Sequence, residues 1–194
     1  MIHGILLAAG RGRRIGGPKA LITLGDQTFH ARLSSTFAGA GLPLISVVNE
    51  AVAASLPVCA RGETRIVNPD PDEGGMFSSV RLGVAEALRR GATGVVLLPV
   101  DHPLVTVEDL GAVSAGLQSG AVVVIAAHNG RRGHPVGLGP AAMAEVASDR
   151  AVATLRDVVR RDPGRVVEIP GSEAVLFGIN TAQDLERASE RAFR

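Results

Sequence analysis

Short apolar runs alternate with amphipathic stretches along most of the chain. The runs are rich in Val, Ile and Leu, which is typical of strands that are buried on both faces of a parallel sheet. Strands are expected at 5–9, 44–48, 65–67, 94–100, 121–127, 134–138, 166–169 and 175–179. Helices are expected at 28–40, 51–56, 78–90, 106–117, 140–147, 151–161 and after 181. This alternation predicts one three-layer α/β/α domain over residues 1–194, with a Rossmann-like, mostly parallel (mixed) sheet.

Capping and turn residues mark several boundaries in this pattern. Ser78 or Ser79 is expected to cap the helix that follows it, because a hydroxyl can accept a hydrogen bond from the first helical turn. The Asn-Gly pair at 129–130 is a strong signal for a two-residue hairpin. Thr181 and Asp184 have the spacing of a capping box, which predicts the start of the last helix.

Composition narrows the classes of function. Hydrophobic residues make up 46% of the 194 residues, and the net charge is +1 with 20 basic and 19 acidic residues. This balance gives no overall basic surface for nucleic acid. The chain also has five Phe, no Trp and no Tyr, so it lacks the rings that stack on single-stranded bases. No nucleic-acid partner is expected.

The same composition favours a cytoplasmic protein. No apolar stretch approaches the roughly 18 residues of a membrane helix, so no membrane partner is expected. No signal peptide is visible before the first predicted strand. Cys59 is the single cysteine and cannot form a disulfide within the chain, which fits a reducing compartment.

A glycine-rich basic loop follows the first predicted strand. Residues 6–19 read Leu-Leu-Ala-Ala-Gly-Arg-Gly-Arg-Arg-Ile-Gly-Gly-Pro-Lys. Glycines let the backbone approach a ligand closely, and successive N–H groups in such a loop can bind an anion. The neighbouring cations Arg13, Arg14 and Lys19 match the charge of a polyphosphate. The alternative is a solvated basic turn.

This loop differs from the two commonest phosphate-binding loops. Lys19 is followed by Ala20, whereas a Walker A loop needs Ser or Thr there. Gly10, Gly12 and Gly16 are spaced one residue too widely for a dinucleotide-binding fingerprint.

A carboxylate follows the most apolar predicted strand, 94–100. Asp101 would lie at the carboxyl ends of the strands, on the same edge as the glycine loop. Mg²⁺ is held in proteins by one or two carboxylates together with substrate phosphates, which suits Asp101. The alternative role is a helix cap, but Thr106 is the better cap for the next helix. His102 is expected in the pocket wall.

Three further positions carry polar side chains at predicted turns. Asn180 has an amide oxygen suited to a hard metal ion, or else it serves the strand-to-helix turn. Ser78 and Ser79 begin a helix whose free N–H groups could bind a base or a phosphate, or else they only cap it. His134 follows a basic turn and is either an acceptor-binding or a structural histidine.

The glycine loop resembles the signature L-A-A-G-x-S/G-x-R-M/L-G-x-x-K of the MobA-like nucleotidyltransferases. The matching residues are Leu7, Ala8, Ala9, Gly10, Gly12, Arg14, Ile15, Gly16 and Lys19, with Ile15 the one departure. The resemblance implies a fold of the nucleotide-diphospho-sugar transferase type and an NTP bound over this loop. The nucleotide-binding residues it implies are Leu7, Ala8, Ala9, Gly10, Gly12, Arg13, Arg14, Lys19, Ser78 and Ser79.

Other segments also resemble this family, and the two at 75–83 and 132–136 narrow the resemblance to its molybdenum cofactor cytidylyltransferases. Residues 101–103 resemble the family's Asp-x-Pro, with His102 where Met or Gln is common. Residues 180–185 resemble N-T-x-x-D-L, 75–83 resemble G-M-x-x-S-L/V-x-x-G, and 132–136 resemble R-G-H-P-V. The resemblance implies that Asp101 and Asn180 bind Mg²⁺ and that Arg132 and His134 bind the acceptor.

The reaction implied by this resemblance is the transfer of CMP from CTP to the phosphate of molybdopterin, with release of pyrophosphate. Lys19, Arg14 and Asp101 would be the catalytic residues, and no side-chain nucleophile would be needed. Ala8-Ala9-Gly10 is the form associated with pyrimidine nucleotides, whereas guanylyl-transferring relatives tend to have Leu-Ala-Gly-Gly.

Two other functions stay open at this point. The enzyme could use GTP, or its acceptor could be a sugar phosphate or another phosphorylated metabolite. The chain could instead be a non-catalytic carrier that binds a nucleotide or cofactor and delivers it to a molybdoenzyme or its maturation factor. The presence of Lys19, Asp101 and Asn180 argues against a carrier, because a degenerate binder would be expected to have lost one of them.

Overall fold

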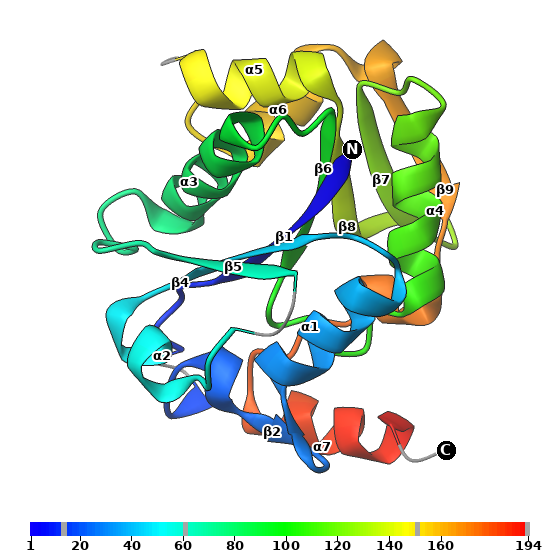
Figure 1. The fold of residues 1–194 in the computed structure, drawn as a ribbon. Helices are drawn as coiled ribbons and strands as arrows, with labels where there is room; N and C mark the ends of the chain where they lie inside the picture. The colour runs from blue at the N-terminus through cyan, green and yellow to red at the C-terminus, as the bar shows by residue number, and fades with distance from the viewer. Residues whose placement is uncertain (13–14, 60–61, 150–151, 193–194) are drawn as a thin grey trace.

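A seven-stranded sheet forms the middle layer of the protein, with helices on both of its faces (Figure 1). The structure is a computed structural model, and it describes residues 1–12, 15–59, 62–149 and 152–192. The strand order is β5-β4-β1-β6-β8-β7-β9. The strands are β1 (Ile2–Ala8), β4 (Leu44–Val48), β5 (Glu63–Val67), β6 (Gly94–Pro99), β7 (Val123–His128), β8 (Arg131–Leu138) and β9 (Val166–Pro170). The predicted α/β fold is confirmed.

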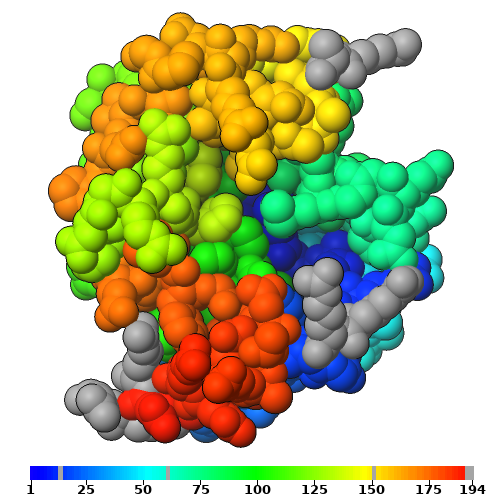
Figure 2. Space-filling view, turned by 180° about the vertical axis from the view of Figure 1, so that it is seen from behind, coloured from blue at the N-terminus to red at the C-terminus, as the bar shows by residue number. Residues whose placement is uncertain are grey.

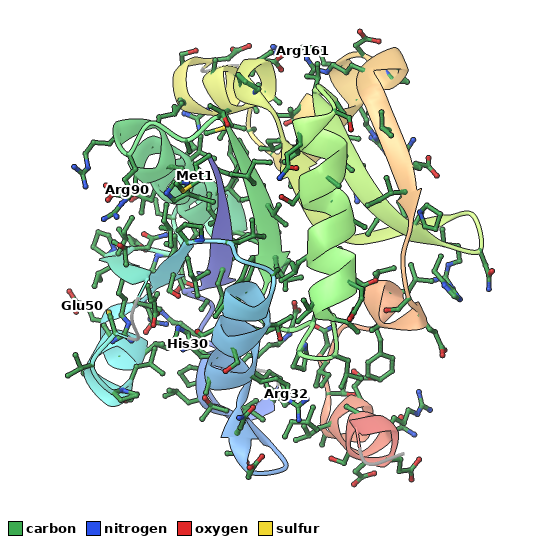
Figure 3. All side chains as sticks on the ribbon, turned by 45° about the vertical axis from the view of Figure 1, so that its right-hand side comes forward. Met1, His30, Arg32, Glu50, Arg90 and Arg161 are labelled. Carbon is green, nitrogen blue, oxygen red and sulfur yellow. The ribbon has the colours of Figure 1, made fainter. Side chains whose placement is uncertain are left out.

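The helices divide between the two faces of the sheet. They are α1 (Phe29–Gly39), α2 (Glu50–Ser55), α3 (Gly75–Arg89), α4 (Val107–Gln118), α5 (Pro140–Ser148), α6 (Leu155–Arg161) and α7 (Ala182–Ala192). Helices α1 and α4 lie side by side on one face (Figure 3), while α3 and α5 cover the other. Within the described ranges, no helix is long and apolar enough to cross a membrane.

Side chains of the central strands alternate between two cores. Leu6 and Ala8 of β1 pack with the core beneath α1 and α4, whereas Ile5 and Leu7 pack with the core beneath α3 and α5. Successive residues of a strand point to opposite faces, so a strand that is covered on both sides must be apolar throughout. This requirement explains the uninterrupted apolar runs in the sequence.

The direction of the strands determines where the loops gather. Strands β5, β4, β1 and β6 are parallel, and β8 runs antiparallel to both β6 and β7. The turn between β7 and β8 has positive φ angles at Asn129 (49°) and Gly130 (72°), as the two-residue hairpin requires. The carboxyl ends of the four parallel strands therefore meet at one edge of the sheet.

Two predicted boundaries were wrong. Helix α3 begins at Gly75, so Ser78 and Ser79 are its fourth and fifth residues and do not cap it. The Ser78 hydroxyl instead donates a hydrogen bond to the Gly75 carbonyl oxygen, 2.8 Å away. Helix α6 begins at Leu155 rather than at 151, because Thr154 forms a capping box with Asp157.

The predicted strand at 175–179 is also absent from the sheet. The segment after β9 contains a short 3₁₀ helix, η4 (Glu173–Leu176), and then an extended stretch. Asp109 on α4 fixes the start of this segment, because its carboxylate accepts hydrogen bonds from the Ser172 backbone N–H (2.8 Å) and hydroxyl (2.7 Å). The chain is thereby drawn away from the sheet after Pro170. The pattern also missed η2 (Lys19–Leu21), β2 (Thr23–Leu24) and β3 (Gln27–Thr28).

We expect Gly83→Ala to lower the free energy of unfolding by about 1–3 kcal/mol, as overpacked core substitutions do. Gly83 lies on α3 against β1, and an added Cβ would be 2.7 Å from Cγ2 of the buried Ile5. Urea denaturation of both proteins measures the change.

Gly111→Ala on α4 is the matched control. It is also a helical glycine, but an added Cβ meets no atom within 4 Å. Alanine there should raise the free energy of unfolding by up to about 1 kcal/mol, through helix propensity alone. Equal stabilisation by both substitutions would contradict the packing of α3 on β1.

Candidate active site

The glycine loop begins at the carboxyl end of β1 and is held by the neighbouring strand. Asn49 follows β4 and caps α2, and its side-chain amide donates a hydrogen bond to the Ala9 carbonyl oxygen at 2.8 Å. Within the loop, the N–H groups of Ile15 and Gly17 donate to the Gly12 carbonyl oxygen at 3.0 and 3.2 Å. Gly12 has a φ of 59°, and a Cβ there would overlap the Gly17 carbonyl oxygen, so this turn requires glycine.

Lys19 joins three distant parts of the chain. Its ammonium donates hydrogen bonds to Asp101 Oδ2 at 3.0 Å and to Asn180 Oδ1 at 2.7 Å. Asp101 follows β6, the strand next to β1, and its carbonyl oxygen accepts a hydrogen bond from the Ile179 N–H at 2.7 Å. This backbone bond brings Asn180 to the edge of the sheet. The structure thus places together three side chains singled out from the sequence.

The same oxygens fit a divalent cation. The ammonium of Lys19 is a positive charge held between a carboxylate and an amide oxygen, which are the donors that Mg²⁺ prefers. The side chains of Lys19 and Asp101 are only 17% and 24% exposed, so the charges are partly shielded from water. Among the described residues, no group of three or more His, Cys, Asp or Glu could hold a metal ion. Mg²⁺ is held by few protein ligands and takes phosphate oxygens as well.

A cleft of about 190 Å³ lies beside this cluster. Figure 2 shows this face, with the first residues of the chain (dark blue) and the segment after β6 (green) deep between the start of α3 (teal) and the C-terminal segments (orange and red). The cleft is lined by Leu7, Ala9, Gly10, Gly12, Lys19, Pro71, Gly75, Met76, Ser79, Pro99, Val100 and Asp101. Six of the predicted nucleotide-binding residues therefore line this cleft, namely Leu7, Ala9, Gly10, Gly12, Lys19 and Ser79. Ala8 and Ser78 do not line it.

Asn68 arranges the hydroxyl groups at the start of α3. This buried residue follows β5, and its side-chain amide donates to Ser78 Oγ at 2.8 Å and to Ser79 Oγ at 3.0 Å. Sequence reasoning missed Asn68 as a site residue. The sequence feature that could have identified Asn68 is its position directly after the predicted strand 65–67 of the parallel sheet. The corresponding position after the strand 94–100 identified Asp101.

Two histidines lie behind the aspartate. The rings of His102 and His134 are 4.8 Å apart between centroids and meet edge to face at 63°. His102 Nε2 is 3.9 Å from Asp101 Oδ1. Burial, and to a smaller extent His102, lowers the pKa of His134 to about 4. Burial also lowers the pKa of His102, against the opposite effect of Asp101. Both rings are therefore neutral at pH 7.

The predicted acceptor-binding residue Arg132 does not join this cluster. Arg132 Nε on β8 donates to Glu168 Oε1 on β9 at 2.7 Å, across the intervening strand β7, and the two side chains are 47% and 41% exposed. Its guanidinium thus lies in a surface ion pair and not in the wall of the cleft. Arg13 and Arg14 lie outside the described residues.

The chain is similar to a known domain family and to proteins that it matches over nearly their whole length. The model of the MobA-like NTP transferase domain matches residues 4–166. The chain is 31% identical to a molybdenum cofactor guanylyltransferase of Acidiphilium cryptum, over 96% of this chain and 93% of that protein. It is 32% identical to nicotine blue oxidoreductase of Paenarthrobacter nicotinovorans, over 96% of this chain and 95% of that protein.

A solved structure also covers nearly the whole chain. Rv0371c from Mycobacterium tuberculosis superposes with a TM-score of 0.79 at 26% identity, over 97% of both chains. A manganese complex of Rv0371c superposes with a TM-score of 0.75 at 24% identity, over 97% of this chain and 98% of that one. The second likeness, at its lower identity, shows the fold alone.

We expect the free energy of unfolding to fall as the pH drops from about 6.5 to about 4, in part through His134. In the unfolded chain this imidazole takes up a proton near its ordinary pKa of 6.5, whereas in the folded chain it does so only near 4. Its contribution is complete above pH 6.5 and is lost across that window, at about 1.4 kcal/mol per pH unit at most.

Denaturation of the wild type and of His134→Gln across this window measures the effect. The variant keeps a neutral side chain of similar size, so it should lose less stability between pH 6.5 and 4. Identical losses in both proteins would show that His134 is not held neutral by burial.

Proposed function

Because the chain belongs to the MobA-like NTP transferase domain family and is a nucleotidyltransferase, we propose that it transfers CMP from CTP to the phosphate of a molybdopterin-type acceptor. The observation that carries the proposal is the convergence of Lys19, Asp101 and Asn180 beside the glycine loop. This cluster combines a mobile cation with two oxygen ligands at the edge where α/β proteins bind nucleotides.

The cleft offers a separate contact to each part of the nucleotide. The triphosphate lies over the glycine loop, whose backbone can approach it because Gly10 and Gly12 have no side chains. The base lies toward the start of α3, where Ser79 lines the cleft. Lys19 exchanges its two oxygen partners for the phosphates, because an ammonium on a flexible stem can turn from one anion to another.

The chemical step is a displacement at the α-phosphorus. An oxygen of the acceptor's terminal phosphate forms a bond to this phosphorus, the bond to the β-phosphate oxygen breaks, and pyrophosphate leaves. The attacking phosphate is already ionised at pH 7, so no side chain has to remove a proton. Mg²⁺ held by Asp101 and Asn180 would orient the phosphates and neutralise the leaving pyrophosphate. Lys19 stabilises charge on the same oxygens as the transition state forms.

The side chain of Ala9 supports a pyrimidine base. Ala9 is 3% exposed and lines the cleft, so its methyl group takes up space where the resembled guanylyl branch has glycine. The second candidate is guanylyl transfer from GTP, and the observation that favours it is the name of the curated relatives. Among acceptors, a sugar phosphate or another phosphorylated metabolite is the alternative to molybdopterin.

Product analysis with the four NTPs and purified molybdopterin tests the proposal. We expect kcat/KM for CTP to exceed that for GTP at least about tenfold, because a wrong base leaves polar groups of the site unpaired. Mass spectrometry should show the cytosine dinucleotide of the acceptor, with an equal amount of pyrophosphate. A preference for GTP, or equal rates with all four NTPs, would refute cytidylyl transfer and leave nucleotidyl transfer intact.

Lys19→Ala separates an enzyme from a carrier in the same assay. Loss of one preorganised charge in such a site lowers the rate on the order of 10²–10³. Arg89→Ala is a suitable control, because Arg89 is an exposed residue of α3 whose side chain pairs with Glu86. Normal turnover by Lys19→Ala would contradict the proposed catalytic role of Lys19. Nucleotide binding by the wild type without any product would favour the carrier.

A further inference from the structure

His102 fills the space between the two chain segments that carry Asp101 and Asn180. On one side, a Cβ added at Gly178 would lie 3.2 Å from His102 Nε2 and 3.5 Å from His102 Cε1. The same Cβ would lie 3.5 Å from Asn180 Nδ2. The histidine ring thus lies next to residue 178, two residues before Asn180, and a methyl group added there would push the ring by a few tenths of an ångström.

The other sides of the ring are also occupied. His102 Nε2 faces Asp101 Oδ1 at 3.9 Å, and the ring of His134 packs against it edge to face. The side chain of His102 is only 12% exposed. Its backbone is fixed by a tight turn, in which the His102 N–H donates to the Pro99 carbonyl oxygen and the Val105 N–H donates to that of His102. The ring is therefore surrounded by Asp101, His134 and the segment at Gly178.

We propose that His102 is a positioning residue of the cation site. Its ring, backed by His134, sets the distance between Asp101 Oδ2 and Asn180 Oδ1, and residue 178 is glycine because the ring lies where a side chain would be. This inference rests on the cation site of the proposed function. It goes beyond that function because it assigns a role to His102, which neither touches a substrate nor exchanges a proton.

A positioning residue matters here because a metal site tolerates only small displacements of its ligand atoms. Ligand oxygens must be held within about 0.5 Å of the productive geometry by packed neighbours. Loss of such outer partners typically weakens metal binding about 10–100-fold. One backbone hydrogen bond, from the Ile179 N–H to Asp101, joins the two ligand segments. The His102 ring lies between the same two segments and adds a second contact between them, made by a side chain.

A double-mutant cycle on Mn²⁺ binding tests the proposal. Electron paramagnetic resonance would give the Kd for Mn²⁺ alone with the wild type, Gly178→Ala, His102→Ala and the double variant. We expect each single substitution to raise the Kd about tenfold, in the range for lost outer partners. In the double variant the two effects should not add, because the new methyl group occupies space that the ring has left. Its Kd should be no higher than that of His102→Ala.

Two further variants separate positioning from general stability. His102→Met should bind Mn²⁺ more tightly than His102→Ala, because a long flexible side chain refills much of the space. His128→Ala is the matched control: its ring Nδ1 donates a hydrogen bond to the Gly171 carbonyl oxygen at 2.9 Å, in the segment that leads to Asn180, and its atoms are not among those nearest to Gly178. It should leave the Kd for Mn²⁺ unchanged.

Kinetics add a readout that a purely structural role would not produce. With His102→Ala, the Mg²⁺ concentration needed for half-maximal turnover should rise, while kcat at saturating Mg²⁺ stays within a few-fold of the wild type. Additive effects in the cycle, or a normal Kd for Gly178→Ala, would overturn the role of His102. Failure of both the wild type and Lys19→Met, which lacks the competing ammonium, to bind Mn²⁺ would overturn the cation site, and with it both the proposed function and this inference.

Discussion

The ammonium of Lys19 is the interaction on which the site depends. It lies between the oxygens of Asp101 and Asn180, 82 and 161 residues further along the chain. Lys19 is also the one lysine among the 20 basic residues of the sequence. An ammonium is a compact charge with donors on a flexible stem, whereas the planar guanidinium of arginine is suited to bidentate pairing. Residue 19 must bind the oxygens of Asp101 and Asn180 and then release them to bind phosphates, and lysine suits both requirements.

The rest of the fold brings these three groups to one point. Adjacent parallel strands β1 and β6 deliver the glycine loop and Asp101 to the same edge of the sheet. Asn49, at the end of β4, holds the start of the loop, and Asn68, at the end of β5, orients the hydroxyl groups of α3. Asp109 on α4 binds Ser172 at the start of the segment that follows β9. This contact directs the segment toward the cleft, where it places Asn180. The site is thus built mainly from the ends of strands, where backbone positions are least free to vary.

The sequence predicted the parts of this arrangement that follow from local periodicity. Strands such as β6 are apolar throughout because both faces are buried, and carboxyl ends of parallel strands share an edge, so Lys19 and Asp101 could be placed on one side in advance. Asn180 was singled out by its amide oxygen and by the family resemblance. The strand expected before it is instead a 3₁₀ helix and an extended stretch, and a backbone bond to Asp101 brings Asn180 to the site. Arg132 was grouped with His134, but a register shift between β7 and β8 interrupts the alternation along β8 between them. The contacts of Asp109 with Ser172 and of His102 with Gly178 join residues more than 60 positions apart. Local sequence patterns do not predict such contacts.

The affinity for Mn²⁺ in the absence of nucleotide, compared between the wild type and Lys19→Met, tests the central claim most directly. If the ammonium occupies the place of the metal ion, its removal frees Asp101 Oδ2 and Asn180 Oδ1 and leaves the carboxylate without its cation. Lys19→Met should then bind Mn²⁺ more tightly than the wild type, while Asp101→Asn should bind it more weakly. Unchanged or weaker binding by Lys19→Met would contradict the account, because it would show that the lysine and the metal do not share these oxygens.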